Sequence, residues 1–278
     1  MKHLIAIILT TFVHTQPSWL TIHGSRQFSI SGVASFENGF LVVHDNKKMK
    51  QPRLSYLDRS FKLRKLIWPE TNLPYDLEAL HLMPGFANKF VAMESTGKAY
   101  IFLVDPFDFR IEILSTITLP GISNKMNLEG FAVFQSAQGT VFIYGDRGSN
   151  KRKSTLITAF FDPQNNKIDT IEKFVIDLPI PEKSKRNIAD IAIDKNGAVW
   201  TVATSDPGNN GPFKSAIYQI GHLNNVGTFN YNHPDLLKPL IVIDEQKIEA
   251  MMFKDNELVL MTDNENNGSS YFSIKEAF

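Results

Sequence analysis

The chain has 278 residues, 43% of them hydrophobic, so it is long enough to bury one large core. Its 29 Lys and Arg residues balance 29 Asp and Glu residues, and this zero formal charge excludes the strong positive field of a typical nucleic-acid-binding protein. The absence of cysteine excludes disulfides and thiolate chemistry and suits an oxidising compartment.

The first fifteen residues have the order of a secretory signal peptide. Met1-Lys2-His3 precedes the apolar run Leu4–Val13, and Val13-His14-Thr15 offers a cleavage site in place of Ala-x-Ala. The apolar run is too short to span a bilayer as a helix. We therefore expect residues 1–15 to be a signal peptide of a periplasmic or secreted protein with no integral membrane segment. The alternative is a β-strand of the folded domain.

The segment Trp19–Ile30 alternates apolar and polar residues and precedes the first of five similar units. Each unit has a short apolar strand that opens with a small or acidic residue, a Gly or Asn turn, an apolar strand that ends in an acid, and a polar loop. The units begin at Ser31, Glu78, Glu129, Ala189 and Glu249. These starts are 47, 51, 60 and 60 residues apart, close to the period of four-stranded propeller blades.

The second and third units contain four predicted strands each. In the second unit they are Glu78–Leu82, Lys89–Glu94, Ala99–Val104 and Arg110–Leu119; in the third they are Glu129–Phe134, Thr140–Gly145, Thr155–Phe161 and Asp169–Leu178. The fifth unit ends after three strands, so Trp19–Ile30 is expected to supply its fourth. The sequence predicts one all-β domain over residues 19–278, a five-bladed β-propeller closed by this N-terminal strand. An incomplete six-bladed ring is the alternative.

The first strand of each propeller blade lines the central axis, so the unit starts are expected to converge there. Three carboxylates brought together in this way repel one another unless a cation lies among them. Ca²⁺ takes about six to eight oxygen ligands in flexible geometry. The sequence therefore predicts an axial calcium site formed by Ser31, Glu78, Glu129, Glu249 and Asp190, the neighbour of Ala189. The alternative is that these residues cap or hydrogen-bond the blades.

A second set of acids ends the second strand of each unit, on the same face of the ring: Asp45, Glu94, Asp146, Asp206 and Asp263. Asp45 and Asp146 are candidate catalytic acids or bases. Arg147 follows Asp146 in a Gly-Asp-Arg-Gly turn, and its guanidinium suits a phosphoryl or carboxylate group. We take Asp45, Asp146 and Arg147 as the candidate catalytic residues.

The recurrent Glu-Ala or Glu-Gly step before an apolar strand, followed by an apolar strand that ends in Asp, resembles the phytase-like esterase propellers. More loosely it is similar to the regucalcin and paraoxonase-like calcium propellers. The order Ser31, Glu78, Glu129, Glu249 also looks like the axial calcium site of the calcium-activated nucleotidases, which are five-bladed apyrases. That family has a serine in blade four, where this chain has Ala189. Asp45 and Arg147 fall where the family has an acid and an arginine near the phosphates.

The resemblance implies a calcium-dependent hydrolase of a small phosphorylated or ester substrate, with a phosphoester, phosphoanhydride or lactone as the scissile group. We expect the protein to be a monomer. The alternative is a non-catalytic secreted propeller that binds a saccharide or protein, with calcium holding the blades together. No nucleic-acid partner is expected for either function.

Overall fold

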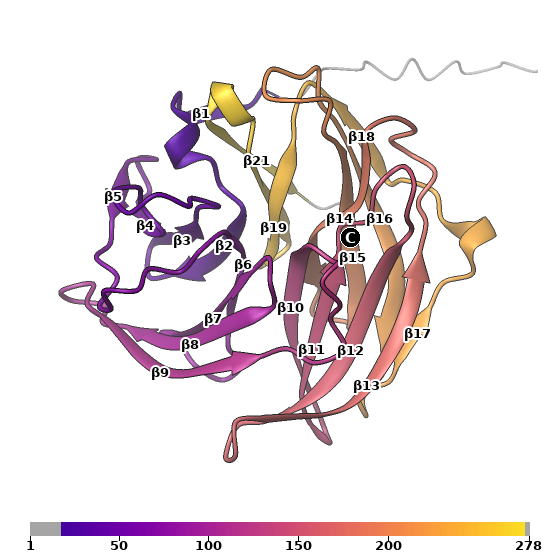
Figure 1. Cartoon of the computed structure of the whole chain (residues 1–278), viewed down its shortest axis with the longest axis horizontal. Coiled ribbons are helices and arrows are strands. Elements are labelled where there is room, and N and C mark those ends of the chain that lie inside the picture. The colour runs from indigo at the N-terminus through magenta and orange to yellow at the C-terminus, as the bar shows by residue number, and fades with distance from the viewer. Residues whose placement is uncertain (1–17, 276–278) are drawn as a thin grey trace, which may run out of the picture.

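The computed structural model describes residues 18–275, and the predicted signal peptide lies outside the described residues. Within this part of the chain, 21 strands form five antiparallel sheets, accompanied by three short 3₁₀ helices. The sheets are arranged as blades around a common axis (Figure 1). This confirms the predicted all-β, five-bladed propeller and excludes the six-bladed alternative.

Blades one to three each contain four strands in sequence order. Blade one consists of β2 (Gly32–Phe36), β3 (Gly39–Val43), β4 (Leu54–Leu57) and β5 (Leu63–Lys65). Blade two consists of β6 (Leu77–Leu82), β7 (Lys89–Glu94), β8 (Lys98–Val104) and β9 (Ile111–Thr118). Blade three consists of β10 (Leu128–Ser136), β11 (Gly139–Asp146), β12 (Ser154–Asp162) and β13 (Lys167–Ile176).

Blade four has a divided outer edge. Its strands are β14 (Lys185–Ile193), β15 (Ala198–Ser205), β16 (Lys214–Leu223), β17 (Phe229–Tyr231) and β18 (Ile241–Asp244). The first half of β16 pairs with β18 and the second half pairs with β17. Between these two strands lies the helix η2 (Pro234–Leu236). The end of β18 therefore lies beside the start of β16, on the face that carries the loops between second and third strands.

Blade five is completed by the N-terminal segment, as predicted. Its strands are β19 (Ile248–Lys254), β20 (Glu257–Thr262), β21 (Ser269–Lys275) and β1 (Leu20–His23). Leu20 lies opposite Tyr271, so β1 covers the outer edge of β21 and joins the N-terminal segment to the last strands of the chain. The strand is shorter than expected, because residues Arg26–Phe28 form the helix η1; helix η3 (Glu265–Asn267) lies in the β20–β21 loop.

Small residues allow the first strands to approach one another at the axis. A Cβ on Gly32 would lie 2.6 Å from the backbone nitrogen of Leu80, and one on Gly130 would lie 2.6 Å from Cγ1 of Ile191. Outside this ring, apolar side chains fill the space between sheets; Phe142 and Phe161, for example, stack with centroids 4.5 Å apart. Packing at the axis therefore requires glycine at these two positions, which follow Ser31 and Glu129.

In the described chain no helix has the length and apolar character needed to cross a membrane.

Candidate active site at the propeller axis

One face of the propeller carries both the loops that enter each first strand and the loops between second and third strands. The four largest cavities described, of about 870, 550, 350 and 310 Å³, are all lined by these loops. The axial acids lie on the same face, because they are near the start of the first strands. This face is where a ligand can reach the axis.

Arg186, at the start of β14, occupies the position in the axial ring where the sequence analysis placed Ala189. Its Nη1 lies 2.8 Å from Oε1 of Glu129 and 3.2 Å from Oε1 of Glu249, and its Nη2 donates to Asp206. Only 16% of the Arg186 side chain is exposed. The axis therefore carries a built-in cation between two of its three glutamates.

Lys247 supplies a second buried cation just before β19. Its Nζ lies 2.7 Å from Oε1 of Glu265, 3.0 Å from Oε1 of Glu249 and 3.3 Å from Oδ2 of Asp263. Burial alone would lower the pKa of this amine, but the surrounding carboxylates raise it above the ordinary lysine value. Lys247 is thus an ammonium ion at neutral pH.

Two arginines extend this arrangement to the surface. Nη1 of Arg147 lies 3.0 Å from Oε1 of Glu129, and Nη2 of Arg26 lies 2.7 Å from Oε2 of Glu265. Together these contacts form a continuous chain of alternating charges, which we call the axial charge network: Arg26, Glu265, Lys247, Glu249, Arg186, Glu129 and Arg147. Buried charges are tolerated when they are paired in this way.

Glu78 is the axial glutamate that the network leaves out. It is 8% exposed, and no residue of the described chain donates a hydrogen bond or ion pair to its carboxyl group. Burial, followed by the negative charges of Glu129 and Asp76, raises the pKa of Glu78 well above its ordinary value. Lys47, the ammonium on this side, is engaged by Asp76 at 2.9 Å. The surroundings of Glu78 therefore favour the protonated form of its carboxyl group.

Asp45 is a second carboxyl group with a raised pKa. Burial and the charge of Asp263 raise the pKa of Asp45 to about 7, against the opposing effect of Lys247. Asp45 lines the cavity of about 310 Å³ together with Lys47 and Arg26. The charge of Asp45 also contributes to the raised pKa of Glu78, so the two groups belong to one site.

Two of the predicted metal ligands join neighbouring blades instead of facing the axial cluster. Oγ of Ser31 donates to the carbonyl oxygen of Leu77 at 2.7 Å. The two oxygens of Asp190 accept from the backbone N–H groups of Ile191 at 2.8 Å and Met251 at 2.6 Å. These contacts tie blade one to blade two and blade four to blade five.

Asp146, a predicted catalytic acid, anchors a loop. It is fully buried, its Oδ1 accepts from the N–H of Asn127 at 2.9 Å, and Arg152 pairs with both of its oxygens. Glu94 accepts the N–H of Tyr75 at 2.9 Å in the same manner. Acids that end the second strands of blades two and three therefore fix the loop that enters each blade.

The donor set at the axis does not match the coordination that a divalent ion requires. Within residues 18–275, no three His, Asp or Glu side chains are grouped so that they could hold a metal ion. Arg186 already pairs with Oε1 of Glu129 and of Glu249, and Lys247 pairs with Oε1 of Glu249 as well. These residues do not fit a calcium ion in this arrangement, and the axial calcium site stays a prediction.

Sequence reasoning missed Arg186 and Lys247, although their positions offer a recognisable signal. Arg186 lies three residues before Ala189, and Lys247 lies three residues before Ala250. A cation next to the start of a first strand, in a ring that otherwise supplies acids, indicates an internal counterion.

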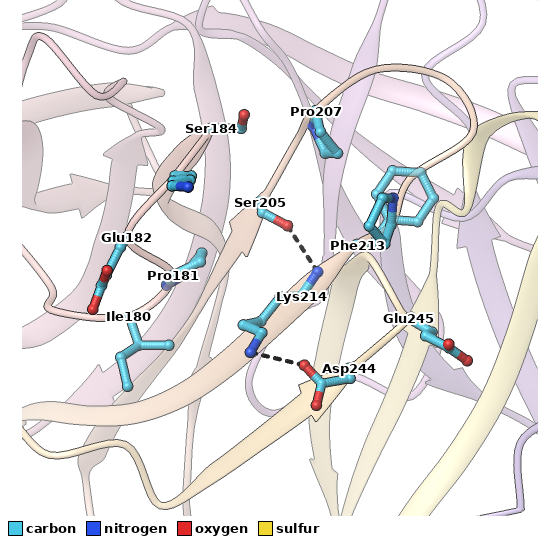
Figure 2. Close-up of a pocket in the computed structure, with 12 residues that line it drawn as sticks. Ile180, Pro181, Glu182, Ser184, Ser205, Pro207, Phe213, Lys214, Asp244 and Glu245 are labelled. Carbon is cyan, nitrogen blue, oxygen red and sulfur yellow. Dashed lines mark hydrogen bonds and ion pairs between the residues drawn. The ribbon is translucent and has the colours of Figure 1, made fainter.

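The largest described cavity, about 870 Å³, is lined mainly by residues of blade four and its loops, which Figure 2 shows. Ile180, Pro181, Pro207 and Phe213 form apolar parts of its wall. On its floor, Nζ of Lys214 pairs with Asp244 at 2.9 Å. It shares Ser184 with the neighbouring cavity of about 350 Å³, so the two are adjacent.

No family model and no curated protein matches the chain. Solved structures with a similar fold include the GH43 endo-arabinanase from Bacillus licheniformis, with a TM-score of 0.52, 10% identity and coverage of 90% of this chain and 94% of that one. The native Bacillus subtilis arabinanase Arb43A has a TM-score of 0.54 and 11% identity, with 93% and 97% covered. A protein described as a glycoside hydrolase has a TM-score of 0.56 and 10% identity, with 94% and 62% covered. At these identities the similarity establishes the propeller fold.

Proposed function

We propose that this protein is a hydrolase that cleaves a saccharide at the mouth of the propeller axis, with Glu78 as the general acid. The observation that carries the proposal is the lack of any cation partner for Glu78 among the described residues, in a ring whose other two glutamates are paired. A buried carboxyl group without a counterion keeps its proton at neutral pH, which a general acid requires.

Asp45 is the proposed general base. Its pKa of about 7 leaves a substantial ionised fraction at neutral pH, and it lines a cavity that admits water. In the reaction, Glu78 donates its proton to the glycosidic oxygen as the bond from that oxygen to the anomeric carbon breaks. A water molecule bonds to the carbon and gives its proton to Asp45. Most glycoside hydrolases use two carboxyl groups, one of which protonates the leaving oxygen.

The saccharide class rests on analogy as well as on the site. The proteins of similar fold are described as arabinanases and glycoside hydrolases, and all share less than 12% identity with this chain. A shared fold makes an activity a reasonable hypothesis but does not assign it. The carboxyl groups of Glu78 and Asp45 give a chemical reason for glycoside hydrolysis that does not depend on this analogy.

A turnover assay tests this proposal. Wild-type protein, Glu78→Gln and Glu112→Gln are incubated with a panel of oligosaccharides, and released reducing ends are measured. Glu112 is exposed on β9 of the same blade, so its substitution is a matched control. We expect turnover by wild type and by Glu112→Gln, and a loss of at least about a hundredfold in Glu78→Gln. No turnover of any saccharide by wild type would favour the non-catalytic binding protein.

The calcium-dependent hydrolase of a phosphoester, phosphoanhydride or lactone is a second candidate. One observation favours it: Oε2 of Glu129 is buried and has no hydrogen-bond partner within the described chain. A cation bound there would satisfy this oxygen. Calcium-dependent turnover of nucleoside phosphates, phytate or lactones, with saccharides unreactive, would replace the saccharide proposal with this one.

A further inference from the structure

A recess of about 350 Å³ beside the axis carries four cations, two of which also belong to the axial charge network. It is lined by residues 147–151 of the β11–β12 loop, by residues 184–186 at the start of β14, and by Asp206. Four of its side chains are cationic, and Asp206 is its one acid. Asp206 is already paired with Arg186.

Two of the four cations remain available to a ligand. Lys185 pairs with Asp177 at 2.9 Å, and Arg186 lies within the axial charge network. Arg147 uses only Nη1, on Glu129; its Nε and Nη2 have no partner in the described part of the chain, and 32% of the side chain is exposed. Lys151 is exposed and makes no ion pair with any described residue. The recess thus presents the unpaired ammonium of Lys151 and the two unused nitrogens of the Arg147 guanidinium.

The loop that carries these two cations is fixed in place. Gly148 has a φ of 68°, and a Cβ there would lie 2.5 Å from Oγ of Ser154. The backbone N–H of Lys185 donates to Oδ1 of Asn150 at 2.6 Å, and the N–H of Asn187 donates to the carbonyl oxygen of Arg147 at 2.7 Å. These bonds attach the loop to blade four, so the donors are preorganised and little ordering accompanies binding.

We propose that this recess binds an anionic group of the substrate, and that the substrate is an acidic saccharide bearing carboxylate or sulfate groups. The inference rests on the proposed saccharide hydrolase. A guanidinium with two unused nitrogens matches the two oxygens of such a group, and the ammonium of Lys151 adds a second charge-assisted contact. The recess includes Arg147 and Arg186 of the axial charge network and shares Ser184 with the cavity over blade four. The bound anion therefore lies between the reacting carboxyl groups and the largest cavity.

Calorimetric binding to the full-length protein tests the inference. The probes are an oligogalacturonate, the same oligosaccharide as its neutral methyl ester, and a sulfated oligosaccharide of matched length. We expect wild type to bind one or both anionic probes more tightly than the ester. Lys151→Ala should weaken anion binding about fivefold and Arg147→Ala about thirtyfold. The matched control is Lys153→Ala, which removes an exposed lysine of the same loop that does not line the recess; its affinity should stay within about twofold of wild type.

The results separate this inference from the proposed activity. Equal binding of the ester and the acid, or equal affinity of the Lys151→Ala and Lys153→Ala proteins, overturns the anion site even if neutral saccharides are hydrolysed through Glu78. Anion binding that depends on Arg147 and Lys151, with no hydrolysis of any saccharide, supports the site and removes the proposed activity. A preference for the sulfated probe over the uronate identifies sulfate as the anion.

Discussion

Substitution of Arg186 by methionine tests the internal counterion at the axis. Methionine keeps an unbranched chain of similar length, but it removes the charge from the centre of Glu129, Glu249 and Asp206. Since Arg186 is only 16% exposed, these acids lose their partner in a poorly solvated place. Breaking a buried ion pair by removal of one partner costs about 3 to 5 kcal/mol. Because 1 kcal/mol shifts the melting temperature of a domain this size by about 2 to 4 °C, we expect Tm to fall by at least about 6 °C.

The assay is thermal and urea unfolding at pH 7, with Arg110→Met as the control. Arg110 is exposed, and no described side chain pairs with its guanidinium, so its substitution should leave the free energy of unfolding within about 0.5 kcal/mol of wild type. Equal stability of the two variants would refute the view that Arg186 neutralises the axial acids. A gain of stability in Arg186→Met would point the same way.

Three further outcomes follow from the site. The pKa of Asp45 rises from 3.8 to about 7 on folding, so the native state binds an extra proton and the stability of the wild type falls as pH rises from about 4 to 7. In urea unfolding, Asp45→Asn should therefore be more stable than wild type at pH 8, by up to about 4 kcal/mol. At pH 3.5 the two proteins should have similar stability. A variant that is no more stable at pH 8 would contradict the raised pKa. Asp146→Asn should lower the free energy of unfolding by about 2 kcal/mol, whereas Asp169→Asn, an exposed control, should leave it unchanged. Equal free energies of unfolding for the two variants would contradict the structural role of Asp146 and favour a catalytic one. Calcium should raise the wild-type Tm by less than about 1 °C relative to a chelator, and a larger rise would favour the calcium site over the internal counterion.

The propeller could be predicted from the sequence because its determinants are local. Each first strand contains a small residue near its axial end, as at Gly32 and Gly130, where a larger side chain would clash, and the number of these starts gives the blade number. Closure by β1 followed from counting three strands after Glu249. These features depend on pattern and length, which the chain displays directly.

The charge pairing at the axis depends on contacts that the pattern does not display. Arg186 meets Glu129 across 57 residues and Glu249 across 63. The register of β14 against β15 also shifts between Arg186 and Asp190, so counting from Ala189 leads to the wrong side chain. The spacing of the repeats therefore predicted the positions of the axial acids, whereas the cations that pair with them could be identified only in the structure.

The role of Glu78 as general acid is tested most directly by comparing two leaving groups. A general acid matters most when the leaving oxygen is a poor leaving group, and least for an activated aryl glycoside. For Glu78→Gln, we expect kcat/KM to fall at least about a hundredfold on an oligosaccharide but by less than about tenfold on a nitrophenyl glycoside of the same sugar. An equal loss on both substrates would contradict proton donation by Glu78.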